Sequence, residues 1–509
     1  MRPTARFEQS AEHYPDSVCL IFGGASQTYA AVARAMRRVA NRLAAADLRP
    51  GAHGAVLSPN DPTAFTATLG LLHGGMVWLP LNPRNSVAEN GLILAELDCD
   101  VLFVHRSFAA AVDELRAAAP AIREVVLLDE LDAWLGDIGD QPTCGNDDPH
   151  LLAAISATSG TTGRPKGVML SYNNFEAFTA GLLDTVAGDP PPVYAAAAPI
   201  THVGGRICFA ILAAAGAIVV LPRPEPSALL DAIATHRVTD LFLPPTVIYS
   251  LLDEPRTRQT DVSALRHIMY GSAPMRTDML KRALQTFGPV MVQGYGQTEA
   301  PLLLATLRPD DHYIGGRIAP DSRLVSAGRP TRSVAMAILD EQGNQQPAGT
   351  VGEVCVRGDV VMTGYYNNPA ATAEVSRFGW HHTGDLGYLD PDGFLYLVDR
   401  KKDMIVTGGF NVYSAEVEQV LLDDDAVAEA VVIGVPDPKW GEAVKAIVTA
   451  ASGRIIDTDR LLAAARTRLG GVKTPKSIEV WDELPRNSAG KVLKRQIRER
   501  FWADQQRRV

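Results

Sequence analysis

The chain has 509 residues, of which 46% are hydrophobic, and it carries a formal net charge of −10. That length is too great for one hydrophobic core and predicts roughly three structural domains, while the composition is that of an ordinary globular protein. The acidic balance argues against a protein that binds nucleic acid or acidic membranes, because both partners attract basic surfaces. Any polyanionic ligand must therefore be held by local basic groups.

The cysteines and the apolar runs exclude further classes of protein. The five cysteines are scattered, with no Cys-x-x-Cys pair, so the sequence predicts neither a disulfide framework nor a metal cluster. Residues 1–14 are polar and lack the apolar core of a signal peptide. The longest apolar run, at 207–221, is too short to span a bilayer. We therefore expect a cytoplasmic protein without an integral membrane segment.

Short apolar runs alternate with helical patterns from residue 7 to about residue 149. This alternation is typical of a parallel sheet flanked by helices. Residues 136–150 are rich in Asp, Gly and Pro and are predicted to form an exposed connector. The expected strands lie at 54–57, 76–81, 101–104 and 124–128, and an expected helix lies at 65–73.

The stretch Thr158 to Gly167, with the sequence TSGTTGRPKG, follows an apolar run that is predicted to be a buried strand. Gly160 and Gly163 can adopt backbone angles closed to other residues, so this loop can fold tightly around a ligand. Its hydroxyls, backbone amides and cations suit a polyanion such as a triphosphate. It is not a Walker A loop, because its lysine follows a proline and the glycine spacing differs. The hydroxyls belong to Thr158, Ser159, Thr161 and Thr162, and the cations to Arg164 and Lys166.

A second series of strands and helices runs from residue 168 to residue 287, so ligands are expected where strand ends meet loops. Between residues 328 and 400 the pattern changes to short strands with Gly and Pro turns. From residue 403 onward the sequence predicts a compact α+β unit of one small domain's length. The fold class is therefore α/β, with two doubly wound subdomains, a small β-barrel-like subdomain and a C-terminal α+β domain.

The segment QGYGQTE, residues 293–299, combines three kinds of group that suit a nucleotide. Tyr295 offers a flat face to a purine, and Thr298 offers a hydroxyl to a phosphate. Glu299 offers a hard oxygen ligand for Mg²⁺. An aromatic–glycine turn on its own is a common loop, and it is the position after the phosphate loop that favours a functional role.

Three shorter motifs can be explained by local structure as well as by function. His202 lies in PITHVGG, and a histidine in so short a motif is often structural. The segment GSAP at 271–274 also suits a plain turn between a strand and a helix. A Gly–Asp turn at 384–385 is a routine β-turn, although the Asp385 carboxylate could also accept two hydrogen bonds from a ligand.

In this order the motifs resemble those of the adenylate-forming superfamily, which includes acyl-CoA synthetases, adenylation domains of nonribosomal peptide synthetases and firefly luciferase. The resemblance runs from Thr158 to Lys491, about two thirds of the chain, whereas the N-terminal third shares only the general alternation of strands and helices. It implies that a carboxylic acid attacks the α-phosphorus of ATP to give an acyl adenylate. The acyl group then passes to the thiol of coenzyme A, with Mg²⁺ as the metal.

The resemblance implies a boundary at Lys402, with an N-terminal adenylation domain at 1–401 and a mobile C-terminal domain at 402–509. It implies that Lys491 contacts the substrate carboxylate and the α-phosphate, and that Lys402 is the hinge. It also assigns the remaining roles: Lys166, His202, Thr298 and Glu299 in catalysis; Thr158 and Glu299 at the metal; Thr158 to Gly163 at the phosphates; Gly271, Ser272, Ala273 and Tyr295 at the adenine; Asp385 and Arg400 at the ribose; Gly408 and Gly409 at the pantetheine of coenzyme A.

Gln297 makes the motif more similar to CoA ligases than to peptide-synthetase domains, which tend to carry proline there. The pocket candidates are small or apolar, which favours a hydrophobic acid and a fatty acid in particular; they are Val203, Gly204, Gly205, Thr246, Ser272 and Gly294. Arg206 is the one unusual charge. It is expected to extend its head toward solvent, with the alternative that it binds a second carboxylate or a polar tail.

Several alternatives stay open at this point. An aryl-CoA ligase would carry the same motifs, and so would an acyl-AMP ligase that loads a separate carrier protein. No feature demands a luciferase, and a non-catalytic relative would be expected to lose Glu299 or Lys491. The expected partner is a small carboxylic acid, with no nucleic acid, and a homodimer is left open.

Overall fold

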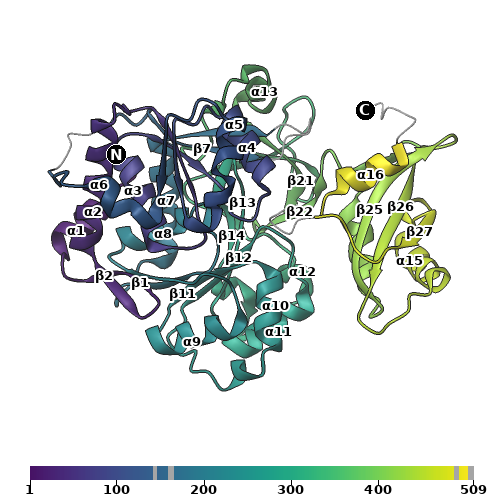
Figure 1. Ribbon diagram of the computed structural model, residues 1–509. Helices are drawn as coiled ribbons and strands as arrows, with labels where there is room; N and C mark the ends of the chain where they lie inside the picture. Colours follow the sequence, from purple (N-terminus) through teal and green to yellow (C-terminus); the bar gives the residue numbers. More distant parts are fainter. Residues whose placement is uncertain (142–145, 159–164, 487–491, 503–509) are drawn as a thin grey trace. The chain divides into compact units, whose positions relative to one another are not determined.

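The computed structural model describes residues 1–141, 146–158, 165–486 and 492–502. The chain divides into two compact units. Unit 1 comprises residues 1–336 and 356–381, and unit 2 comprises residues 337–355 and 382–509. Figure 1 labels the elements of both units. The domain boundary at Lys402 stays a prediction.

Unit 1 contains a nine-stranded sheet with the strand order β17-β14-β13-β12-β11-β9-β10-β1-β2. The strands from β13 to β1 run parallel, while β14 pairs antiparallel with β13, and β2 with β1. The bounds are β1 (Val18–Phe22), β2 (Ala25–Thr28), β9 (Val193–Ala196), β10 (Ala217–Val220), β11 (Asp240–Leu243), β12 (His267–Gly271), β13 (Met291–Gln297), β14 (Ala300–Leu307) and β17 (Arg329–Pro330).

A seven-stranded sheet with the order β20-β8-β7-β4-β3-β5-β6 is the second sheet of unit 1. The strands from β7 to β6 run parallel. Strand β8 pairs antiparallel with β7, and β20 pairs antiparallel with β8. The strands expected in the N-terminal third are confirmed here. The bounds are β3 (His53–Leu57), β4 (Val77–Pro80), β5 (Val101–Val104), β6 (Glu124–Leu127), β7 (Leu152–Thr158), β8 (Lys166–Ser171) and β20 (Gly364–Tyr365).

Helices join the strands and cover the sheets of unit 1 (Figure 1). Helix α7 contacts β8 of one sheet and β14 of the other, and α8 packs against α7, β9 and β10. Helix α7 therefore links the two sheets, and α8 packs between α7 and the nine-stranded sheet. The bounds are α1 (Ala5–His13), α2 (Tyr29–Ala45), α3 (Pro62–His73), α4 (Val87–Glu96), α5 (Val112–Ala118), α6 (Leu131–Leu135), α7 (Tyr172–Val186), α8 (Val203–Ala213), α9 (Pro226–His236), α10 (Pro245–Asp253), α11 (Thr277–Phe287), α12 (Asp321–Leu324) and α13 (Pro369–Val375), with a small hairpin of β15 (Tyr313–Ile314) and β16 (Arg317–Ile318).

Local sequence explains where these elements begin. Helix α3 starts with Pro62, and the side chain of Asp61 accepts a hydrogen bond from the Thr63 amide, which satisfies a free helix-end donor. Helix α7 starts with a reciprocal cap between Ser171 and Asn174. Strands β4 and β5 are apolar and buried throughout, as expected for a parallel sheet covered on both faces.

Unit 2 consists of two small sheets with their helices. A four-stranded sheet has the order β18-β19-β21-β22, and a five-stranded sheet has the order β24-β23-β26-β25 with β27 beside β26. Apolar clusters cover both faces of the five-stranded sheet. The bounds are β18 (Ala335–Leu339), β19 (Gly352–Arg357), β21 (His381–Leu389), β22 (Leu395–Arg400), β23 (Ile405–Thr407), β24 (Phe410–Val412), β25 (Val427–Asp437), β26 (Gly441–Ala450), β27 (Ser477–Val480), α14 (Ser414–Leu422), α15 (Thr458–Lys473) and α16 (Lys494–Trp502).

The predicted fold class is confirmed by this architecture. The second strand–helix series was predicted without β9, β13 and β14, and β13 contains most of the QGYGQTE motif. Within the described residues, none of the helices has the length and apolar character needed to cross a bilayer.

The contact between α2 and α3 gives a test of the packing. A Cβ atom on Gly70 of α3 would lie 2.4 Å from Cγ1 of Val39 in α2. Gly70→Ala should therefore overpack this contact, lowering the free energy of unfolding by about 1–3 kcal/mol and with it the melting temperature. Gly181→Ala in α7 is the control, because the nearest atom to its Cβ is Ser333 Oγ at 3.7 Å. That variant should gain about 0.5–1 kcal/mol from helix propensity. Calorimetry checks both, and equal shifts would contradict the packing.

Candidate active site

The two ends of the predicted phosphate loop lie side by side in unit 1. Thr158 ends β7 and Lys166 begins β8, and these two residues are partners in the antiparallel ladder. The Thr158 hydroxyl donates to the Lys166 carbonyl at 3.3 Å. A Cβ on Gly167 would lie 2.5 Å from Leu97 Cδ2, so glycine is needed there. The roles predicted for Ser159, Gly160, Thr161, Thr162 and Gly163 lie outside the described residues.

Strand β20 brings a tyrosine between Lys166 and Glu299. Tyr365 pairs in register with Val168 of β8, and the Lys166 Nζ lies 5.0 Å from the centroid of the Tyr365 ring. The Tyr365 hydroxyl donates to Glu299 Oε1 at 2.9 Å. Burial, followed by the Glu299 charge, raises the pKa of Tyr365, so its hydroxyl stays a donor. Sequence reasoning missed Tyr365, because its neighbours come from strand pairing rather than from a motif of its own.

The backbones of the two predicted adenine segments run side by side. Gly271 of β12 is the register partner of Gly294 of β13, and a Cβ on Gly271 would lie 2.5 Å from the Gly294 carbonyl oxygen. Ser272 has a φ of +66°, a strained value for a residue with a side chain. Ser272 and Ala273 are exposed, whereas Tyr295 is buried. Parallel pairing thus brings together residues that lie more than 20 positions apart in the chain.

Two further residues complete the motif at the end of β13. Thr298 and Glu299 form the turn between β13 and β14. The backbone carbonyl of Glu299 accepts a hydrogen bond from the Met362 amide at 2.7 Å. The side chain of Gln297 lies 2.9 Å from His381 Nε2.

His202 lies immediately before α8, at the carboxyl edge of the seven-stranded sheet. The neighbouring Thr201 hydroxyl donates to the Leu81 carbonyl, just beyond β4, at 3.1 Å. A Cβ on Gly205 would lie 2.0 Å from the Ile200 carbonyl oxygen, so the helix can begin here only with glycine. Burial, and then the charge of Arg206, lowers the pKa of His202 to about 4. The imidazole is therefore neutral at neutral pH.

A small apolar cavity lies beside α8 in unit 1. Leu303 on its wall has a φ of +63°, which is a genuine outlier for a bulky residue and marks a strained wall. Of the predicted pocket residues, Gly294 lines this cavity. The lining residues are Leu182, Ile207, Phe242, Met269, Tyr270, Val292, Gly294 and Leu303.

Arg206 corrects one expectation from the sequence. Its side chain was expected to extend toward solvent, but the residue is only 4% exposed. The helix that carries it packs against α1, α7 and the strands β9 and β10 rather than lying on the surface. The prediction was wrong because a single sequence does not show which face of a helix is covered.

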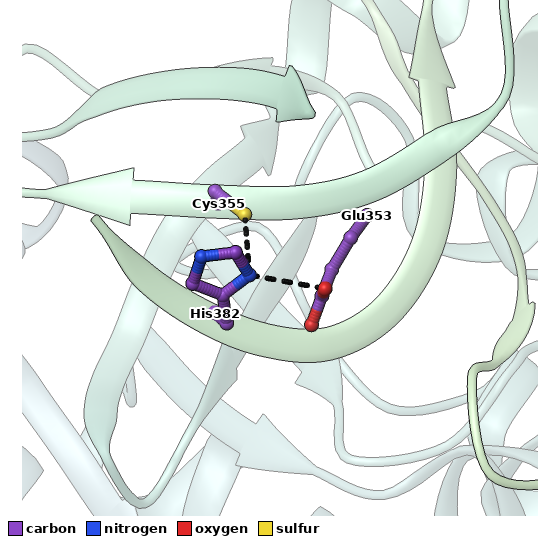
Figure 2. A group of neighbouring side chains, drawn as sticks. All are labelled: Glu353, Cys355 and His382. Atoms are coloured by element: carbon purple, nitrogen blue, oxygen red, sulfur yellow. Dashed lines mark hydrogen bonds and ion pairs between the residues drawn. The ribbon is translucent and has the colours of Figure 1, made fainter. Parts of the chain in front are cut away.

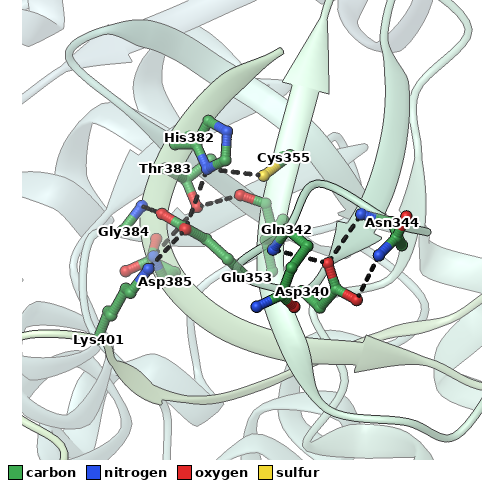
Figure 3. Close-up of polar contacts among 11 residues, drawn as sticks. Asp340, Gln342, Asn344, Glu353, Cys355, His382, Thr383, Gly384, Asp385 and Lys401 are labelled. Atoms are coloured by element: carbon green, nitrogen blue, oxygen red, sulfur yellow. Dashed lines mark hydrogen bonds and ion pairs between the residues drawn. The ribbon is translucent and has the colours of Figure 1, made fainter. Parts of the chain in front are cut away.

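In unit 2 the two predicted ribose residues contact each other. Asp385 of β21 and Arg400 of β22 are register partners, and the Asp385 Oδ1 lies 2.8 Å from the Arg400 Nε. The Asp385 amide bonds to the Thr383 hydroxyl at 3.1 Å, and that hydroxyl donates to the Val354 carbonyl (Figure 3). Antiparallel pairing thus fixes the carboxylate in a defined position.

A buried polar cluster supports this turn, and sequence reasoning missed it. Figure 2 shows His382 between Glu353 and Cys355 of β19, with His382 Nδ1 lying 3.0 Å from Glu353 Oε2 and 3.4 Å from Cys355 Sγ. Glu353 also accepts hydrogen bonds from the Gly384 amide at 3.2 Å and from Lys401 Nζ at 3.1 Å (Figure 3). Burial raises the pKa of Glu353, but the hydrogen bonds from His382 and Lys401 outweigh it and lower that pKa below its usual value.

The same three side chains offer ligand atoms within 4.8 Å of one another, as a metal site would. However, the Lys401 ammonium group pairs with the carboxylate that a metal would need. The negative charge of Glu353 is thus already matched, so we interpret the cluster as a structural support for Gly384.

The remaining predicted residues of unit 2 lie near or beyond β23. Burial lowers the pKa of Lys402. Gly408 and Gly409 both have positive φ in the turn between β23 and β24, and a Cβ on Gly408 would lie 2.6 Å from the Trp440 ring. The role predicted for Lys491 lies outside the described residues. The predicted site residues thus fall into two groups, one in each unit.

The family described as AMP-binding enzyme matches residues 7–366, and the AMP-binding enzyme C-terminal domain matches residues 416–491. A feruloyl-CoA synthase of Amycolatopsis sp. is 40% identical over 491 residues, which are 96% of this chain and 96% of that protein. A medium/long-chain-fatty-acid–CoA ligase of Mycobacterium tuberculosis (strain ATCC 25618 / H37Rv) is 36% identical over 445 residues, covering 83% of this chain and 76% of that protein.

The fold agrees with these sequence matches. The crystal structure of ATP-bound MatB from Rhodopseudomonas palustris has a TM-score of 0.89 to this chain at 29% identity, and the match covers 99% of both chains. The chain therefore belongs to the AMP-binding enzyme family, in the acyl-CoA ligase branch of the adenylate-forming superfamily.

Proposed function

We propose that this AMP-forming acid–thiol ligase activates a hydrophobic carboxylic acid with ATP and Mg²⁺, and transfers the acyl group to coenzyme A. The observation that carries the proposal is the contact series in unit 1 from Lys166 through Tyr365 to Glu299. It joins the base of the phosphate loop to a carboxylate that suits a magnesium ion. The apolar cavity beside Gly294 supports a hydrophobic acid.

The chemistry needs no nucleophile from the protein. A carboxylate is a poor acyl donor, because its leaving group would be oxide. Attack of the carboxylate on the α-phosphorus of ATP forms the mixed anhydride and releases pyrophosphate. Positioning and charge stabilisation are then the enzyme's contribution. We assign Lys166 to the phosphates and Thr298 to the α-phosphate.

Magnesium would neutralise charge on the departing pyrophosphate, and the oxygen donors Glu299 and Thr158 fit that ion. The Tyr365 hydroxyl orients Glu299 by donating to one carboxylate oxygen. Neutral His202 can lie against the reacting carboxylate without protonating it at neutral pH.

For the nucleotide we assign Asp385 and Arg400 to the ribose, supported by Glu353 through the Gly384 amide. In the second half-reaction the thiol of coenzyme A attacks the acyl carbonyl and AMP leaves. Gly408 and Gly409 are assigned to the pantetheine, and Lys402 to the hinge. Lys491 is assigned to the first half-reaction, where its cation bridges the carboxylate and the α-phosphate.

A fatty acid and an aryl acid are the two candidate substrates. The fatty-acid proposal is supported by the apolar cavity and by the relative from Mycobacterium tuberculosis. The aryl alternative is supported by the 40% identity to a feruloyl-CoA synthase and by the aromatic side chains of Phe242 and Tyr270 in the cavity wall. A third relative, a fatty acid–[acyl-carrier-protein] ligase of Streptomyces coeruleorubidus at 34% identity, keeps a carrier protein as the alternative acceptor.

An acid panel tests the proposal. Pyrophosphate, AMP and thioester are measured with graded fatty acids and with aryl-propenoic acids, each with and without coenzyme A. With coenzyme A we expect AMP, pyrophosphate and thioester in equal amounts, and without it pyrophosphate and the acyl adenylate. Pyrophosphate and acyl adenylate without thioester in the presence of coenzyme A would indicate a carrier protein as acceptor. Formation of no pyrophosphate from any acid would refute the proposed function.

Two adjacent tyrosines test the assignment of Glu299. Tyr365→Phe removes the hydroxyl that orients Glu299, so the Mg²⁺ concentration for half-maximal rate should rise about 10-fold or more. Tyr366→Phe is the matched control, because its hydroxyl also donates to a carboxylate, Asp98 Oδ2 at 2.9 Å, on the exposed surface. The Mg²⁺ titration of this control should match the wild type. Equal titration curves for the two variants would contradict the assignment.

A further inference from the structure

Arg206 is a buried cation that has no acidic partner among the residues the structure describes. It lies in the first turns of α8 and is 4% exposed. Its Nη2 donates to the Ser156 hydroxyl, whereas its Nε has no hydrogen-bond partner in the described part of the chain. Burial lowers the pKa of Arg206 to about 10, so the guanidinium is still charged at neutral pH.

Two other partly buried arginines of this protein each have an acidic partner. Arg498 pairs with Asp403 at 2.9 Å, and Arg266 lies 3.6 Å from the buried carboxylate of Asp240. Among the described residues, the ion pairs include none with Arg206. A buried charge is stable only when it is paired and hydrogen-bonded. The missing counter-charge must therefore come from something other than these side chains.

The surroundings of Arg206 are positive rather than negative. The first turn of α8 contains no acidic residue, and the N-terminal amides of a helix carry partial positive charge. The charge of Arg206 also contributes to the lowered pKa of His202. All of these effects favour an anion at this place and disfavour a structural arginine.

The neighbours of Arg206 belong to the candidate site. Ser156 is two residues before Thr158 on β7, so both side chains point to the same face of the strand. His202 is one helical turn before Arg206, and Ile207, the next residue, lines the apolar cavity. The guanidinium thus contacts β7 two residues before the phosphate loop begins, and the residue that follows Arg206 lines the cavity.

We propose that Arg206 is the counter-charge for an oxyanion of the bound ligands, and thus a further binding residue of this site. The inference rests on the proposed function. The oxyanion has two sources: the reacting carboxylate and its adenylate, which every acid provides, or a second carboxylate on the chain of a dicarboxylic acid. Either source supplies Arg206 with the opposite charge that the described side chains do not provide.

The test compares Arg206→Leu with wild type on two matched acids, octanoate and octanedioate, by pyrophosphate release. Loss of a charge-assisted hydrogen bond should lower kcat/KM about 10- to 100-fold. A loss confined to octanedioate identifies the second carboxylate, and an equal loss on both acids identifies the reacting end. Arg206→Lys, which keeps the charge, should recover part of the lost rate.

The melting temperature of the ligand-free protein separates binding from a structural role. Arg206→Leu should melt at or above the wild-type temperature, because it removes an unmatched buried charge. Arg37→Leu on α2 is the control, because the Arg37 Nε is also unpartnered in the described structure. The kcat and KM of this variant should stay at wild-type values. Two results would overturn the proposal. The first is a lower melting temperature for Arg206→Leu together with a proportional loss of kcat/KM on both acids. The second is a kcat/KM within two-fold of wild type.

A binding measurement keeps this result distinct from failure of the proposed function. If wild-type protein turns over no acid, the proposed function fails, and the Arg206 proposal is then decided by ligand-induced shifts in melting temperature. Mg-ATP or one of the two acids should stabilise wild type and should stabilise Arg206→Leu much less. Equal shifts, or none for wild type, would overturn the assignment of Arg206.

Discussion

The antiparallel pairing of β7 with β8 holds together the two ends of the phosphate loop, and the rest of the site in unit 1 depends on it. The outer edge of β8 pairs with β20, which places Tyr365 against Lys166 on one side and Glu299 on the other. Glu299 in turn lies in the turn that joins β13 to β14. Strand pairing thus holds Lys166 and Tyr365 in place, and Tyr365 in turn orients Glu299. If nucleotide binds here as proposed, little further ordering of these groups is needed.

The site also resolves an electrostatic problem posed by the composition. A chain with a net charge of −10 must still bind ATP, and we propose that it does so with positive groups that are concentrated locally. Lys166 and Arg206 carry charge, the N-terminus of α8 adds a partial charge, and His202 is kept neutral by burial and by Arg206. In unit 2, by contrast, the Glu353 carboxylate is matched within the protein by His382 and Lys401. Arg206 thus differs from Glu353 in having no opposite charge beside it among the described residues.

Much of this arrangement could be predicted from the sequence. The glycine-rich loop, the QGYGQTE segment and the strand–helix alternation indicate the fold class, because each depends on local backbone properties. Tyr365 and Glu353 could not be found in this way, since they reach the site through pairing between strands that are distant in sequence. The burial of Arg206 was predicted wrongly for the same reason, because the cover over α8 comes from tertiary packing. The roles predicted for individual residues stay predictions.

The central claim is that the acid attacks the α-phosphorus of ATP, and the fate of the carboxylate oxygens tests it most directly. The acid is labelled with oxygen-18 in its carboxylate and incubated with enzyme, Mg-ATP and coenzyme A, and the products are analysed by mass spectrometry. The account predicts that AMP gains one labelled oxygen, while pyrophosphate stays unlabelled. Label in inorganic phosphate together with ADP, or AMP without label, would contradict it.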